Sequence, residues 1–391
     1  MKKYQVVVVI VVVCLAANCA RVRTSEREPS EDRIAWIENN LRSALEKKHG
    51  AKPHTIAEEM ARANVPGVSV AVIENYKIAW AKGYGVREAG EPDPVTAETL
   101  FQAASISKPF AALAALRLVR DGNLNLDTDV NGALQSWKLP KSDLGPVTLR
   151  QLLSHRAGLN VSGFPGYSAA APAPSVIQVL NGEPPANTPA VRIEKKPGAQ
   201  FQYSGGGYTI VQLLLTDIDP KPFPALMRSL VLEPLGMKHS TFDHPLPAPL
   251  SDSTATAHLN GKPVEGRYHV YPEMAAAGLW TTPSDLALAA IALQHTKSGK
   301  ASPVLDQAGI NEMWTKQGDG PCGLGFFLSG EGDASRFEHN GGNEGFTCLL
   351  VAYQDKGYGA AIMTNSSTGP RLYEKLLRAI ADAYDWPEFS E

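Results

Sequence analysis

Residues 102–119 read QAASISKPFAALAALRLV and contain the only Ser-x-x-Lys of the sequence, Ser105 to Lys108. The Ala- and Leu-rich run that follows is typical of a helix, and Asp121-Gly122 supplies a stop signal. We therefore expect Ser105 at or just before the helix N-terminus, with Lys108 on the same helical face. A buried lysine has a lowered pKa and can accept the serine's proton. One such motif arises by chance in a chain of this length, so the hypothesis of a nucleophilic serine needs partners elsewhere.

The composition is that of an ordinary globular protein. Hydrophobic residues make up 43% and charged residues 20% of the 391 residues, and the formal net charge is −3. The Lys and Arg residues are scattered without a basic stripe, which argues against a nucleic-acid-binding surface. The length allows one large domain or two smaller ones.

The N-terminus has the pattern of an export signal. Lys2-Lys3 precede a short Val/Ile run, so we predict a signal peptide over residues 1–20 and a periplasmic or extracellular protein. The apolar run is too short to favour a membrane span, although an uncleaved anchor is an alternative. Cys19 stands where a bacterial lipoprotein carries its lipid, but Asn18 replaces the small residue expected before it. Membrane anchoring through Cys19 and simple cleavage therefore both stay open.

Beyond this segment, helical and strand patterns alternate. Residues 21–50 are predicted as a tether and an N-terminal helix, with a helical period over Ile34–Lys48. Gly67–Ile73 and Lys77–Tyr84 are β-rich runs that we expect to form a hairpin. Further helices are predicted at Val147–His155, Gly205–Thr216, Pro224–Leu235, after Thr282 and at Arg371–Tyr384. Further strands are predicted at Gly323–Leu328, Arg336–His339, Gly345–Tyr353 and Gly359–Thr364.

A sheet that begins near residue 67 and ends after residue 320 implies an interrupted α/β (α+β) domain. We expect this domain over residues 51–390, with its sheet-bearing part at about 55–120 and 275–390 and a mainly helical insert at about 121–274. Inside the insert, Gly163–Gly198 is a long loop rich in Pro, Ala and Gly, which favours the wall of a binding site.

Two cysteines, Cys322 and Cys348, remain after the predicted signal peptide. Export permits a disulfide between them, but the sequence leaves their pairing open. Neither cysteine lies near a His at metal-ligand spacing, which argues against a zinc site.

A tyrosine in the insert is the first candidate partner of Ser105. Tyr203-Ser204-Gly205 lies on a loop before a predicted helix. A tyrosine beside two cations would be drawn toward phenolate and could act as a base. A purely structural aromatic anchor is the alternative.

A glycine-rich segment near the C-terminus is the second candidate partner. His339-Asn340-Gly341-Gly342 is predicted at the end of one strand and the start of a turn. There the Gly342 N–H could join the Ser105 N–H as an oxyanion donor. A hairpin with a solvated histidine is the alternative.

Taken in order, these segments resemble the motifs of penicillin-recognising serine hydrolases. The resemblance is to the group of class C β-lactamases, D,D-carboxypeptidases and family VIII carboxylesterases, and it covers about residues 55–385. It implies a β-lactamase/transpeptidase-like fold, in which helices flank an antiparallel sheet and a mainly helical domain is inserted. The segments that carry it are SISK at 105–108, LLSHRAGL at 152–159, YSG at 203–205, PLGM at 234–237, AGLWTT at 277–282 and HNG at 339–341.

The resemblance also implies roles for single residues. Ser105 would be the acylated nucleophile, and Lys108 and Tyr203 would take its proton and later activate water. His155 is a competing candidate for the base, but the resemblance implies a structural loop there. No metal or organic cofactor is implied.

In the third motif, His339 and Gly341 would help to place a substrate carboxylate or carbonyl, and the N–H groups of Gly342 and Ser105 would form the oxyanion hole. His339 stands where many relatives have Lys, so we expect carboxylate recognition to weaken as the pH rises past its pKa. Gly205 stands where the family usually has Asn, which disfavours strong β-lactamase activity.

We therefore predict an exported serine hydrolase that acts through an acyl-enzyme on Ser105. Its substrate would be a peptide, amide or ester, with a β-lactam as a slow substrate. A true class C-like β-lactamase and a penicillin-binding or cell-wall-binding module with little turnover are the two alternatives.

Overall fold

The structure is a computed structural model that describes residues 31–389. The predicted signal peptide, Cys19 and the tether up to residue 30 lie outside the described residues. Within the described range, no helix is both long and apolar enough to cross a membrane.

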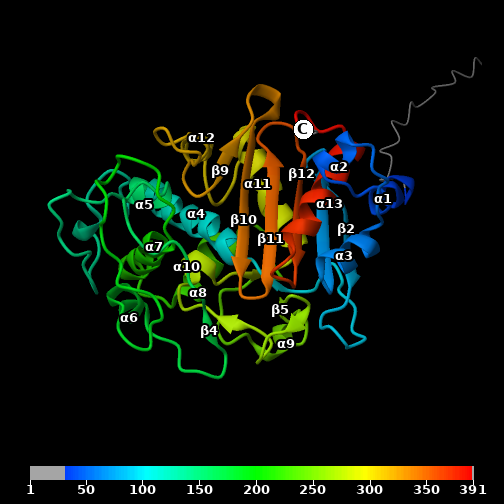
Figure 1. Ribbon diagram of the computed structural model, residues 1–391. Coiled ribbons are helices and arrows are strands. Elements are labelled where there is room, and N and C mark those ends of the chain that lie inside the picture. Colours follow the sequence, from blue (N-terminus) through cyan, green and yellow to red (C-terminus); the bar gives the residue numbers. More distant parts are fainter. Residues whose placement is uncertain (1–30, 390–391) are drawn as a thin grey trace, which may run out of the picture.

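A six-stranded antiparallel sheet lies at the centre of the fold, in the order β2-β1-β12-β11-β10-β9 (Figure 1). The N-terminal hairpin joins the C-terminal strands because β1 pairs with β12, with Val68 opposite Thr364. This arrangement confirms the predicted fold class. The strands are β1 (Gly67–Glu74), β2 (Lys77–Gly85), β9 (Phe327–Ser329), β10 (Arg336–Asn343), β11 (Phe346–Tyr353) and β12 (Gly359–Thr364).

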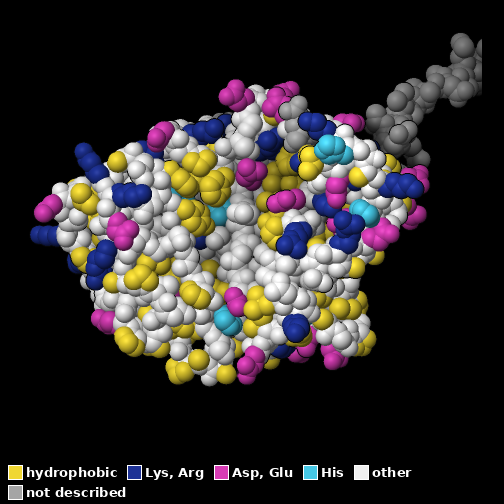
Figure 2. All heavy atoms as spheres, in the orientation of Figure 1, with side chains coloured by type: hydrophobic (Ala, Val, Ile, Leu, Met, Phe, Trp, Pro, Cys, Tyr) yellow, Lys and Arg dark blue, Asp and Glu magenta, His cyan; other side chains and the backbone are white. Residues whose placement is uncertain are grey.

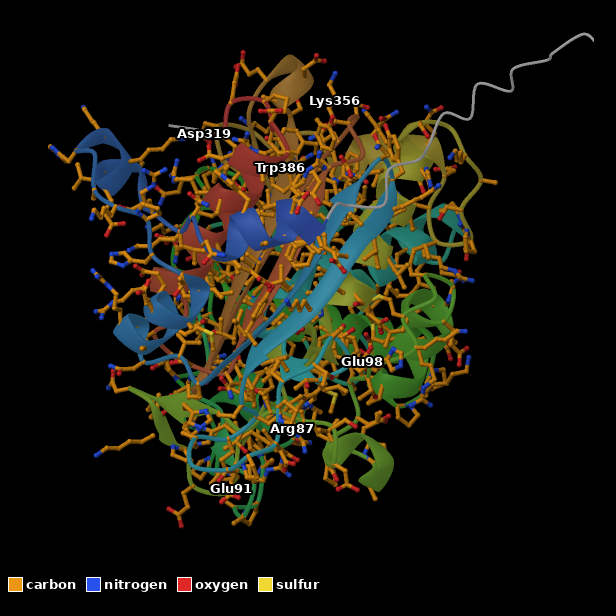
Figure 3. The ribbon with its side chains drawn as sticks, turned by 90° about the vertical axis from the view of Figure 1, so that its right-hand side faces the viewer. Arg87, Glu91, Glu98, Asp319, Lys356 and Trp386 are labelled. Atoms are coloured by element: carbon orange, nitrogen blue, oxygen red, sulfur yellow. The ribbon has the colours of Figure 1, made fainter. Side chains whose placement is uncertain are left out.

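Helices cover both faces of this sheet. The helices α1 (Glu31–Glu38), α3 (Ile56–Ala63) and α13 (Pro370–Ala383) lie on one face, and α11 (Pro283–Lys297) lies on the other (Figure 3). Along β1, Val70 and Val72 belong to the core under α13, whereas the alternate residues Ala71 and Ile73 belong to the core on the α11 side. Because successive side chains of a strand point to opposite faces, a strand covered on both faces is apolar throughout, as GVSVAVI is.

A helical lobe stands beside the β10 edge of the sheet (Figure 1). It packs on α4 (Ser107–Arg120), and a single hydrophobic core joins the lobe, α4 and α11. The lobe contains α5 (Leu149–Leu153), α6 (Val176–Asn181), α7 (Gly205–Ile218), α8 (Phe223–Met227) and α10 (Met274–Ala277). The remaining elements are α2 (Ala44–Lys48), α9 (Ala248–Ser251), α12 (Gln307–Met313), β3 (Phe101–Gln102), β4 (Tyr167–Ser168), β5 (His258–Leu259), β6 (Lys262–Pro263), β7 (His269–Val270) and β8 (Trp280–Thr281).

The single helix predicted over Ile34–Lys48 is wrong. The structure has two short helices, α1 and α2, because the side chains of Asn39 and Asn40 bond back to carbonyls of the preceding turn. Such bonds compete with continued helix. A second helix then starts at Ser43, whose side chain forms a capping box with Glu46.

The strands near the C-terminus also differ from the prediction. β9 starts only at Phe327, because the chain before it turns back on itself at Gly325, where φ is +100°. β10 runs on to Asn343, so His339 to Gly342 lie within the strand and not at its end. The predicted helix after Pro224 stops at Met227 and continues as one π-helical turn.

Candidate active site

Ser105 lies in a single 3-10 turn, Ala104–Ile106, immediately before α4, where the sequence predicted it. The preceding Ala104 has φ of +48°, a left-handed conformation that a side chain disfavours. Ser107 holds this turn: its Oγ donates to the Ala104 carbonyl at 2.6 Å and accepts the Leu279 N–H at 2.9 Å. The turn is therefore tied to the AGLWTT segment, far away in the chain.

Lys108 reaches back from α4 to Ser105. Its Nζ lies 3.0 Å from Ser105 Oγ and donates to the Ala276 carbonyl of α10 at 2.9 Å. The side chain is buried, and neither partner is a carboxylate. Removal from water without a counter-charge disfavours the ammonium form, which lowers the pKa of Lys108 to about 7. The neutral amine, which can accept a proton, is therefore accessible near neutral pH.

Tyr203 lies beside the pair formed by Ser105 and Lys108. Its ring lies 5.0 Å from Lys108 Nζ, and its hydroxyl is near enough to Ser105 for that serine to lower its pKa. It is positioned by the start of α7, where the Ser204 side chain accepts the Gly207 N–H at 3.1 Å. Burial raises the pKa of Tyr203 to about 12, and Ser105 opposes this only in part. The phenolate expected from the sequence is not favoured here, because burial outweighs the effect of Ser105 on this pKa.

His339 is brought to the same place by β10. Its ring centroid is 6.4 Å from that of Tyr203, and the side chain is buried. Nδ1 lies 2.6 Å from the Asn340 carbonyl, which can only accept, so Nδ1 carries the proton. Burial, with Lys108 nearby, lowers the pKa of His339 to about 3. The expected partial charge at neutral pH is therefore wrong: His339 is a neutral group.

The two glycines of the third motif, Gly341 and Gly342, differ in how closely other groups approach them. A Cβ on Gly341 would lie 2.3 Å from the Ala103 carbonyl, so β10 can approach the Ser105 turn this closely only with glycine here. A Cβ on Gly342 would meet nothing within 4 Å. β9 pairs with β10 only as far as Glu338, so no strand of this sheet flanks that edge at Gly342. The Gly342 N–H as an oxyanion donor stays a prediction.

An aromatic cluster that the sequence analysis missed surrounds these groups. His155 lies 4.2 Å from Tyr203 between ring centroids, and Phe327 stacks on Tyr203 at 6.3 Å. His155 Nδ1 accepts the Ser204 N–H at 3.1 Å, and burial holds its pKa well below the usual value. His155 therefore supports the Tyr203 loop. Phe201 and Phe327 carried no sequence signal, because only the fold brings them together.

Comparisons with known proteins show the family and the fold. The sequence profile of the family described as Beta-lactamase matches residues 53–385. The chain belongs to this family. It is 25% identical to Protein flp of Staphylococcus aureus (strain MW2) over 82% of the chain, and it spans 64% of that protein's length. Esterase EstB of Burkholderia gladioli is 32% identical over 176 residues, 41% of the chain and 43% of EstB.

Among solved structures, the octameric penicillin-binding protein homologue from Pyrococcus abyssi superimposes with a TM-score of 0.71 at 25% identity. The match covers 84% of this chain and 76% of that chain. It shows that the Beta-lactamase family fold extends over both the sheet and the helical lobe.

Within this Beta-lactamase family fold, the outer surface is hollowed over β10, between the helical lobe and α13, and hydrophobic side chains border the hollow (Figure 2).

Cys322 and Cys348 are both buried and free, which answers the open question of their pairing. Over residues 31–389, no group of three or more His, Cys, Asp or Glu side chains could hold a metal ion.

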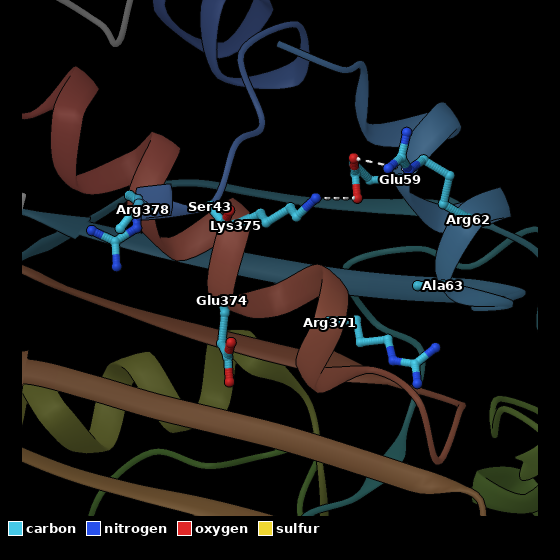
Figure 4. Close-up of a pocket in the computed structure, with 9 residues that line it drawn as sticks. Ser43, Glu59, Arg62, Ala63, Arg371, Glu374, Lys375 and Arg378 are labelled. Carbon is cyan, nitrogen blue, oxygen red and sulfur yellow. Dashed lines mark ion pairs between the residues drawn. The ribbon is translucent and has the colours of Figure 1, made fainter. Parts of the chain in front are cut away.

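A second pocket, of about 370 Å³, lies among α2, α3 and α13 and contains none of the three motifs (Figure 4). Lys375 crosses it to Glu59, with Nζ 3.0 Å from Oε2, and pairs with Glu46 at 2.9 Å. Glu59 also faces Arg62, 3.5 Å away. These pairs connect the N-terminal helices to α13, which is a structural role.

Proposed function

We propose that this member of the Beta-lactamase family is a serine hydrolase that forms an acyl-enzyme on Ser105 with peptide, amide or ester substrates. The observation that carries the proposal is the contact of Lys108 Nζ with Ser105 Oγ at 3.0 Å, made by a buried lysine whose pKa is about 7. A base with a pKa near the working pH is the form that general base catalysis requires.

The reaction follows from these positions. Neutral Lys108 takes the hydroxyl proton of Ser105 as Oγ bonds to the substrate carbonyl carbon, and the oxyanion is held by the N–H groups of Ser105 and Gly342. The bond to the leaving group breaks, and that group takes up the proton from Lys108 through the Tyr203 hydroxyl. A water molecule then gives one proton to Lys108 while its hydroxide adds to the acyl carbon. The bond between that carbon and Ser105 Oγ breaks, Lys108 returns the proton to Oγ, and the acid product leaves.

Deacylation distinguishes this proposal from a binding module. An esterase among the relatives, EstB, and the neutral His339 favour hydrolysis of esters or amides over recognition of a penicillin carboxylate. We also propose that the protein is exported, which rests on the N-terminal Lys2-Lys3 and apolar run.

Intact-protein mass spectrometry tests the acyl-enzyme. The wild type and Ser105→Ala are incubated with 4-nitrophenyl acetate and, separately, with a penicillin. We expect a Ser105-dependent mass gain with the ester that decays as acid is released. A persistent penicillin adduct without ester turnover would favour the binding module. Faster turnover of the penicillin than of the ester would favour a β-lactamase. Full ester hydrolysis by Ser105→Ala would exclude Ser105 as the nucleophile.

A further inference from the structure

Among the described residues, the surface of the site around Tyr203 is aromatic, and the nearby cations Lys108 and Arg156 already have polar or ionic partners. We propose that Phe164 completes this surface and makes the enzyme selective for neutral, apolar acyl groups over acyl groups that carry a carboxylate. The inference rests on the proposed function, since it names the substrate class of the same site. Three observations carry it: the position of Phe164 against Gly205, the aromatic cluster around Tyr203, and the state of the charged groups.

Phe164 fills the space that the third residue of the second motif leaves open. A Cβ on Gly205 would lie 2.9 Å from Cε2 of Phe164 and 3.4 Å from its Cδ2. The main chain fixes this approach, because the Gly205 N–H donates to the Ser162 carbonyl at 3.1 Å and the Gly206 N–H to the Val161 carbonyl at 3.0 Å. A phenyl ring therefore stands where an amide side chain would otherwise project from α7.

A cluster of aromatic side chains around Tyr203 lies beside Ser105. Phe164, Phe201, Tyr203 and Phe327 are each half-buried residues. Phe201 and Phe327 meet edge to face at 6.3 Å, and Phe327 stacks on Tyr203 at the same separation. Half-exposed aromatic side chains offer a large apolar contact area at little cost in conformational entropy.

The charges around the site favour the same class of acyl group. His339, in the position where a carboxylate was expected to bind, is neutral because burial lowers its pKa to about 3. Lys108 is committed to Ser105 and Ala276. Arg156, which follows His155 in the chain, is ion-paired with Asp319 at 2.6 Å. A carboxylate entering the site would lose hydration without gaining a free cation.

Three 4-nitrophenyl esters with the same leaving group test the inference: the acetate, the neutral 3-phenylpropanoate and the anionic hemiglutarate. We expect the kcat/KM of the wild type for the phenylpropanoate to exceed that for the hemiglutarate by about tenfold or more. Phe164→Ala should lower kcat/KM for the phenylpropanoate about tenfold, mainly through KM, and change that for the acetate less than about twofold. Phe164→Leu should restore most of the loss.

Phe389→Ala is the matched control, because it removes a phenylalanine that contacts Arg336 and Trp386 near the C-terminus. It should leave the ratio of the three esters unchanged. Equal or better use of the hemiglutarate would overturn the inference, as would a loss in Phe164→Ala that is the same for the acetate and the phenylpropanoate. If none of the three esters is hydrolysed in a Ser105-dependent way, the proposed function itself fails, which is a different result from hydrolysis without the predicted preference.

Discussion

Two lysines that lie largely out of solvent, Lys108 and Lys375, differ in what surrounds the ammonium group. Lys108 contacts only a hydroxyl and a carbonyl, and its pKa falls to about 7. Lys375, whose side chain is 15% exposed, lies between Glu46 and Glu59. In this pair of contacts, the backbone N–H of Ser43 and the ammonium of Lys375 lower the pKa of Glu46 to about 2.

The comparison shows that burial alone does not make a lysine reactive. A counter-charge stabilises a buried ammonium, and the resulting ion pair has a structural role. Burial beside neutral partners instead lowers the pKa of the amine. We therefore place the proposed catalytic centre at the contact of Lys108 with Ser105 and not at the open pocket beside Lys375.

The largest expected effect is the difference in activity between Lys108→Met and Lys375→Met. Lys108→Met should lower kcat/KM for a 4-nitrophenyl ester by on the order of 10²–10⁴-fold, because the general base is lost. Lys375→Met, the matched control, should stay within about twofold of the wild type. Steady-state kinetics of both purified variants measures this. Comparable losses in the two variants would mean that the difference in their surroundings has no catalytic meaning.

For stability we expect the opposite order, with Lys375→Met losing more than Lys108→Met. Lys375→Met leaves Glu59, whose side chain is 3% exposed, with Arg62 at 3.5 Å as a remaining cationic partner. Breaking a buried pair on one side costs about 3 kcal/mol in the free energy of unfolding when the remaining charge is uncompensated, and Arg62 should reduce that loss. Urea unfolding measures the loss, and adding Glu59→Gln to Lys375→Met should recover part of it. A single variant as stable as the wild type would show that the pair contributes nothing.

The pH dependence tests the protonation of Lys108 directly. Activity needs the neutral amine, so kcat/KM should rise about tenfold per pH unit below pH 7 and level off above it, following the pKa of about 7. Rates from pH 5 to 9 with a neutral ester give the profile, and Lys375→Met should share it. A profile that is flat between pH 5 and 8 would mean that the base is not Lys108.

Glu273 is a buried carboxylate whose protonation, like that of Lys108, depends on burial. Tyr167 donates to its Oε1 at 3.4 Å, Oε2 has no hydrogen-bond partner among the described residues, and burial raises its pKa to about 7. The folded state thus holds this proton more tightly than the unfolded state, and stability falls as the pH rises from about 4.5 to about 7.

Glu273→Gln should therefore gain roughly 2–3 kcal/mol on the wild type at pH 8 compared with pH 5, measured by urea unfolding at both values. A difference between variant and wild type that does not change with pH would show that Glu273 titrates as it does in the unfolded chain.

The local features of this fold could be predicted from the sequence. Ser105 was predicted at the helix start and is found there, because the Ala- and Leu-rich run after it is a strong local signal. The hairpin of β1 and β2 and the strands β11 and β12 follow from periodicity in the same way. The break between α1 and α2 was missed, since it depends on side chains that bond back to the chain at Asn39 and Asn40.

The sequence by itself also determined which residues could do the chemistry: the order of the Ser105, Tyr203 and His339 motifs. Only the tertiary structure decided their protonation and what surrounds them. The carbonyl that holds Lys108 comes from Ala276, 168 positions away, and the ring beside Gly205 comes from Phe164 in a separate loop. Desolvation depends on everything that packs around a group, and these neighbours come from distant parts of the chain. For that reason the neutral His339 and the protonated Tyr203 could not be foreseen from local sequence.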